Sequence, residues 1–125
     1  MNELKLAWES FDFYSKKISE AEAPYQTYHF VLDSFLNNNL HLNTSEKKDL
    51  YKNLNESINC LYNLYYNQIQ SLDGISKALP NKNIPKDHEH LLDVSPESLS
   101  TLKDLTLELI SQLEIDKKNI QFLLM

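Results

Sequence analysis

Glycine is nearly absent from this sequence. The 125 residues include a single glycine, Gly74, and only four prolines. Domains built on sheets normally need many glycines for tight turns and bulges, and phosphate-binding loops need them as well. The scarcity of glycine therefore argues against a glycine-rich nucleotide loop and favours an all-α fold made of few, long helices.

Arginine is missing altogether, because all 12 basic residues are lysines. The 18 acidic residues outnumber them and leave a formal net charge of −6. Arginine is the side chain best suited to bidentate contacts with phosphate and guanine, and an acidic surface is repelled by the nucleic-acid backbone. We therefore expect no nucleic-acid partner.

Cysteine and long apolar runs are also scarce. Cys60 is the only cysteine, so no disulfide can form within the chain, which is typical of a reducing compartment. Charged residues such as Glu3, Lys5 and Glu9 interrupt the apolar core that a signal peptide requires. No apolar run approaches the roughly 20 residues of a membrane span. The sequence predicts a cytoplasmic protein without a membrane partner.

The N-terminal part contains apolar residues at helical spacing. In residues 3–22 they recur three or four positions apart, on one helix face: Leu4, Ala7, Phe11, Tyr14, Ile18 and Ala21. A second helix is predicted over residues 24–38, with Pro24 in its first turn, where the missing N–H of proline is tolerated. The alternative is one long helix that is kinked at Pro24. Three asparagines at positions 37–39 then indicate a loop.

The strongest helical pattern covers residues 45–79. Asn43 and Glu46 match a capping box at its start, although Thr44 and Ser45 are competing caps. Nine positions at strict three–four spacing extend over four heptads, and all but Gln68 are apolar or aromatic: Tyr51, Leu54, Ile58, Leu61, Tyr65, Gln68, Leu72, Ile75 and Leu79. Proline follows directly and ends the predicted helix.

A polar linker is predicted over residues 80–95, followed by a last helix over residues 96–124. Ser95 is suited to cap this helix and Pro96 to occupy its first position. Its predicted buried face again has three–four spacing: Leu99, Leu102, Thr106, Leu109, Leu113, Asp116, Ile120 and Leu123. Leu105, Ile110 and Leu124 widen that face.

Helix lengths predict the architecture. At 1.5 Å per residue, the helices over 45–79 and 96–124 span roughly 50 and 45 Å, and the two N-terminal helices together match one of them. We therefore expect residues 1–125 to form a single domain. This domain would be an antiparallel helical bundle, with a long hairpin of the last two helices and two shorter N-terminal helices beside it.

No motif of catalysis or cofactor binding is present. The sequence has no GxSxG or HExxH, and Cys60 falls on a regular helix beside the buried face. His88 and His90 lie among acidic residues in the linker, and His29 and Asp33 are four positions apart, which would suit metal ligands. No matching ligand pair occurs elsewhere, so we predict a solvated loop, no metal site, no cofactor and no catalytic residues.

Aromatic and apolar side chains outside the predicted buried faces are the candidate partner interface. Tyrosine and tryptophan are enriched where one protein buries another, although a small bundle would equally use such residues as core. The candidates lie on the first helix, on the helix over 45–79 and at the apolar C-terminus: Leu6, Trp8, Phe13, Tyr62, Tyr66, Ile69 and Phe122.

These observations predict a non-enzymatic protein–protein interaction module, such as a small acidic inhibitor or immunity factor, a secretion chaperone or an assembly adaptor. The acidic surface favours a basic protein partner, and a homodimer is also open. The alternative function is a structural coiled-coil subunit of a larger complex. A third is a metal-dependent helical enzyme that would use His29, Asp33, His88 and His90.

Overall fold

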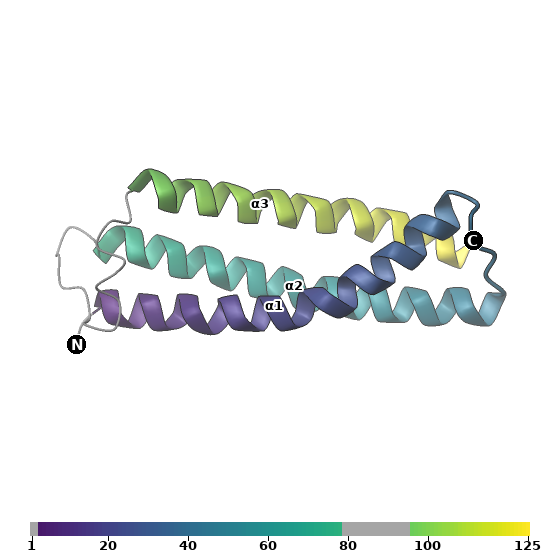
Figure 1. Ribbon diagram of the computed structural model, residues 1–125, viewed down its shortest axis with the longest axis horizontal. Coiled ribbons are helices and arrows are strands. Elements are labelled where there is room, and N and C mark those ends of the chain that lie inside the picture. Colours follow the sequence, from purple (N-terminus) through teal and green to yellow (C-terminus); the bar gives the residue numbers. More distant parts are fainter. Residues whose placement is uncertain (1–2, 79–95) are drawn as a thin grey trace.

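The computed structural model describes residues 3–78 and 96–125, and every regular element in these ranges is helical. The elements are α1 (Glu3–Leu36), α2 (Thr44–Ala78), α3 (Pro96–Asn119) and the 3-10 helix η3 (Ile120–Leu124). In Figure 1, α2 runs antiparallel to both α1 and α3, and in the half that holds the N-terminus it lies between them. The all-α prediction is confirmed. The predicted linker 80–95, with His88 and His90, lies outside the described residues, as does Leu79.

The prediction of two N-terminal helices is wrong, because residues 3–22 and 24–38 belong to one 34-residue helix with Pro24 inside it. The kinked alternative fits better, since α1 changes direction near its middle and crosses over α2 toward the C-terminal end of α3 (Figure 1). Proline removes one backbone hydrogen bond and crowds the preceding turn. The helix continues because the apolar face does: Ile18, Ala21, Tyr25 and Tyr28 all pack against the same core cluster. The predicted four-helix arrangement is therefore replaced by three helices in the described residues.

The connection between α1 and α2 follows the sequence pattern closely. Asn38 has a φ of 62°, a left-handed conformation that asparagine tolerates better than most residues. Asn43 and Glu46 form the predicted capping box, in which the Glu46 N–H donates to Asn43 Oδ1 at 2.8 Å and the Asn43 N–H donates to Glu46 Oε1 at 3.0 Å. The capping box therefore defines where α2 begins.

Helix α2 supplies more of the buried core residues than any other element. Seven of its nine predicted positions are buried: Leu54, Ile58, Leu61, Tyr65, Gln68, Leu72 and Ile75. Gly74 explains how α1 approaches α2 so closely near the N-terminus, because a Cβ placed on it would lie only 3.3 Å from Cβ of Ala7. The lone glycine thus serves a close contact between helices and not a turn.

Helix α3 is covered along only part of its length. Leu99, Leu113 and Asp116 are buried as predicted, as are Ile120 and Leu123 in η3. Leu102 and Leu109 were predicted on the same buried face, but both are exposed. The reason is the path of α1, which reaches α3 only after it has crossed α2 and therefore covers the C-terminal part of α3 but not this region (Figure 1).

Candidate functional site

Three leucines on the N-terminal half of α3 form an apolar surface that no described element covers. Leu102, Leu105 and Leu109 have exposed fractions of 42%, 51% and 44%. Their spacing of three and four residues places them on one face of the helix. We call these three residues the leucine stripe. Isolated exposed leucines are common in monomeric proteins, but an aligned row of them is typical of a binding surface.

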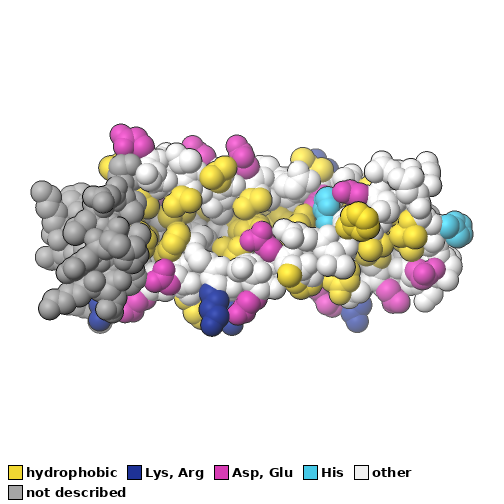
Figure 2. Space-filling model, viewed as in Figure 1, with side chains coloured by type: hydrophobic (Ala, Val, Ile, Leu, Met, Phe, Trp, Pro, Cys, Tyr) yellow, Lys and Arg dark blue, Asp and Glu magenta, His cyan; other side chains and the backbone are white. Residues whose placement is uncertain are grey.

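The leucine stripe continues a helix face that is covered further along α3. Asp116 lies seven residues after Leu109, hence on nearly the same face, and it is only 1% exposed because Tyr25 and His29 of α1 pack over it. In the other half of the molecule, α1 lies on the far side of α2 (Figure 1). Apolar side chains accordingly appear along and beneath α3 on the face shown in Figure 2.

Acidic side chains accompany the leucine stripe. Between residues 96 and 116, α3 carries five acidic residues and a single lysine, Lys103. The Lys103 ammonium lies 3.0 Å from Asp73 on α2, so this positive charge is engaged on the opposite flank of α3. Asp104 and Glu108 are both exposed next to the stripe in sequence, and acidic side chains line the outer edge of α3 in Figure 2. The surface is therefore apolar with a negative border.

A buried polar network marks the point where α1 crosses α3. The Tyr25 hydroxyl donates a hydrogen bond to Asp116, whose other oxygen lies 3.1 Å from His29 Nε2 and 3.2 Å from the Gln112 amide nitrogen. His29 Nδ1 lies 3.2 Å from Asp33. Burial, together with the hydrogen bond to Asp116, raises the pKa of Tyr25 above its ordinary value. This network satisfies a buried carboxylate and fixes α1 on α3.

The predicted pair of His29 and Asp33 is thus brought together, but as part of this structural network. Among the described residues, no group of three or more His, Cys, Asp or Glu side chains is placed to hold a metal ion. Cys60 is exposed on α2 with its thiol free. His88 and His90 lie outside the described residues.

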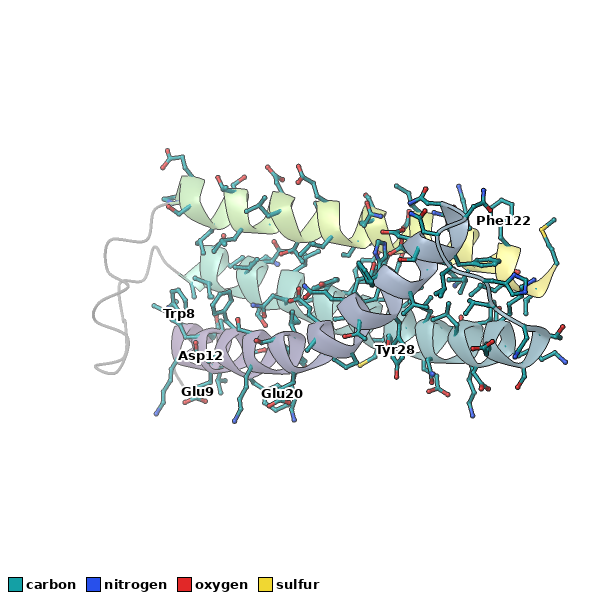
Figure 3. All side chains as sticks on the ribbon, turned by 45° about the vertical axis from the view of Figure 1, so that its right-hand side comes forward. Trp8, Glu9, Asp12, Glu20, Tyr28 and Phe122 are labelled. Atoms are coloured by element: carbon teal, nitrogen blue, oxygen red, sulfur yellow. The ribbon has the colours of Figure 1, made fainter. Side chains whose placement is uncertain are left out.

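The candidate interface residues separate into three groups. Trp8 and Ile69 are buried, so they pack in the core, which was one of the two roles left open for them. In Figure 3, Trp8 lies on the side of α1 toward the other helices, whereas Glu9 and Glu20 project away from them. The exposed group is Leu6, Phe13, Tyr66 and Phe122. Leu6 and Phe13 are seven residues apart on α1 and so lie on nearly the same helix face, where Leu6 borders a hollow between α1 and α2. Phe122 lies at the opposite end of the molecule from Trp8 (Figure 3).

Tyr62 is half-buried at the junction of α2 and α3. Its hydroxyl donates a hydrogen bond to Glu114, which raises the pKa of Tyr62 above its ordinary value, and its ring centroid lies 5.1 Å from that of Tyr66. A shallow hollow next to it is lined mainly by polar residues: Asn59, Asn63, Glu114, Lys117, Lys118 and Gln121. The tyrosine pair therefore borders a helix–helix contact and offers mainly the Tyr66 ring to solvent.

Sequence reasoning assigned the leucine stripe to the core because its spacing is that of a buried face. The sequence signal that could have revealed the stripe is the width of the apolar face of α3. Leu105 and Ile110 make this face wider than one neighbouring helix can cover. Spacing alone does not tell which part of a wide face the rest of the chain reaches.

Comparisons with known proteins give no relative from which a function could be transferred. No family model, no curated protein and no solved structure matches this chain. Within residues 3–78 and 96–125, no helix has both the length and the apolar character needed to cross a membrane. The arrangement of surface residues is therefore the basis for the proposal that follows.

Proposed function

We propose that this chain is a non-enzymatic protein-interaction module that binds another protein through the leucine stripe on α3. The observation that carries the proposal is the row of Leu102, Leu105 and Leu109, which no described element covers, on a face that α1 covers only further along α3. Amphipathic helices and the apolar grooves between helices are a common way for proteins to recognise one another.

The size of the apolar surface supports this proposal. Fully burying a leucine side chain contributes roughly 1.5–3 kcal/mol, so burying the exposed half of each stripe leucine contributes about 1 kcal/mol. Burying three such residues contributes about 3 kcal/mol to the binding free energy. Contacts at the rim of the interface would add to this amount. A surface of this kind with no partner would instead favour self-association or aggregation.

The test compares two double variants with matched exposure. Leu105→Gln with Leu109→Gln removes apolar groups from the stripe, while Leu6→Gln with Phe13→Gln removes side chains of α1 that are 47% and 54% exposed. Glutamine is a good helix former, so both variants keep their helices. Each protein is used to capture partners from a lysate of the organism that encodes it, and bound proteins are quantified by mass spectrometry.

We expect the stripe variant to lose the proteins that the wild-type chain captures, with its melting temperature nearly unchanged, and the α1 variant to retain them. Truncating an anchor residue in an interface typically lowers affinity by about thirtyfold or more. If the stripe variant and the wild-type chain capture the same proteins, the proposal is wrong. Loss of binding in the α1 variant alone would assign the interface to Leu6 and Phe13.

A further inference from the structure

We infer that the partner segment that occupies the leucine stripe is a single basic amphipathic helix. This inference rests on the proposed function and adds the shape and the charge of the occupant. Three observations support it: the way α1 covers the same face elsewhere, the spacing of the leucines, and the distribution of charge along α3.

The covered half of α3 shows what this helix face accepts. Around Asp116, the residues that pack over it, Tyr25 and His29, come from one helix and are one helical turn apart. The leucine stripe lies on nearly the same face, and Leu102 and Leu109 are separated by about 10 Å along the helix axis, at 1.5 Å per residue. A helix that packs along this row meets side chains at three–four spacing. Side chains with this spacing form the ridges that fit into the grooves of a neighbouring helix. The occupant would thus continue along α3 where α1 turns away.

The site has a defined end at the crossing of the helices. A hollow there is lined by Tyr25, Gln26, His29, Phe30, Asp33 and Gln112. Gln112 lies three residues after Leu109, so the hollow continues the stripe along the same helix, and Phe30 is a highly exposed aromatic side chain at this point. The occupying helix would therefore end against Phe30 and the acidic side chain of Asp33.

The charge distribution favours a basic occupant. Glu108 is exposed one turn after Leu105 and borders the stripe, and Asp104, one turn before Glu108, is exposed further around the helix. Asp33 lies at the end of the stripe, and Lys103 is paired with Asp73. Lysine side chains that flank the apolar face of a partner helix would find opposite charges on this border. A second copy of this chain is a poorer occupant, because it would bring the same acidic border to the contact, and its single lysine between residues 96 and 116 is already paired with Asp73.

The test uses the full-length chain and three synthetic 18-residue peptides. The first has leucines at three–four spacing with lysines on the flanks, the second has the same composition in scrambled order, and the third has glutamate in place of lysine. Their dissociation constants are measured by fluorescence anisotropy at low and moderate ionic strength. The scrambled peptide separates helix docking from general attraction between opposite charges.

We expect the basic amphipathic peptide to bind at least tenfold more tightly than the other two, and its affinity to fall as salt is added. Leu105→Gln with Leu109→Gln should weaken this binding by about thirtyfold or more, and Asp104→Lys with Glu108→Lys should shift the preference toward the acidic peptide. The Leu6→Gln, Phe13→Gln variant should bind as the wild type does. If a double variant fails to fold by circular dichroism, Leu105→Gln alone tests the same contact.

Equal binding of the scrambled peptide, or binding that the stripe variant leaves unchanged, would overturn the inference. So would a wild-type dimer in sedimentation that the stripe variant converts to monomer, because the occupant would then be a second copy. If lysate capture depends on the stripe while the peptides show no preference, the proposed function stands and this inference about the partner fails.

Discussion

The network around Asp116 gives the sharpest stability prediction, because this carboxylate is buried to 99% of its surface yet fully engaged by neighbours on two helices. Asp116→Ala removes the acceptor for Tyr25 and the partner of His29. A hydrogen bond to a charged group contributes about 1.5–3 kcal/mol, which applies to the buried Tyr25 bond. The bond to His29 contributes less, about 1 kcal/mol, because that side chain is 27% exposed and retains Asp33.

We therefore expect Asp116→Ala to lower the free energy of unfolding by about 2.5–4 kcal/mol, a large part of the stability of a protein this size. Urea unfolding followed by circular dichroism measures this loss. A double-mutant cycle with Tyr25→Phe then isolates the pairwise term, which should be at least about 1 kcal/mol. A loss below about 1 kcal/mol in the single variant, or a coupling energy near zero, would refute the claim that this network fixes α1 on α3.

Three further predictions concern the core and the tyrosines. Leu61→Ala, at a fully buried position of α2, should cost about 2–5 kcal/mol, and a thermal melt that shifts by less than a couple of degrees would contradict its central place. Burial raises the pKa of Tyr65 to about 12, above the ordinary value near 10 that it takes when unfolded, so the neutral ring stabilises the fold below pH 10. That contribution should be lost between pH 10 and pH 12, so the wild type should lose stability relative to Tyr65→Phe in urea unfolding over this range. If the free energies of unfolding of the two proteins fall in parallel with pH, the prediction is wrong. Tyr66→Ala should leave the melting temperature nearly unchanged because its ring is exposed, whereas adding Tyr62→Ala should lower it, since Tyr62 bonds to Glu114; equal melts would contradict this assignment.

Much of the fold was predictable from the sequence, because helix starts and buried faces depend on local patterns. The capping box at Asn43 and Glu46 and the buried face of α2 through Leu61 follow from spacing and from the chemistry of helix ends. The helix prediction was wrong at Pro24, where it placed a boundary between two helices. Proline usually ends a helix, and only the continuous apolar face across it, supported by packing on α2, keeps α1 intact.

The leucine stripe and the Asp116 network were not predictable for a related reason. Both depend on where α1 crosses α2, which is a tertiary property that spacing along α3 does not contain. Leu109 and Asp116 have the same place in the repeat, seven residues apart, yet one is exposed and the other buried. Asp116 also shows that a charged residue on a helical face can belong to the core when a histidine and a tyrosine reach it from another helix.

We propose that the leucine stripe is a surface for another protein. The most direct test of this proposal is site-specific photo-crosslinking in the organism that encodes the chain, with the photoreactive residue p-benzoylphenylalanine placed at Leu105 in one version and at Phe13 in another. These positions are exposed to similar extents, 51% and 54%, on different helices. We expect a discrete crosslinked product with another protein from position 105 and none from position 13. Crosslinking from position 13 with no product from position 105 would contradict the proposal.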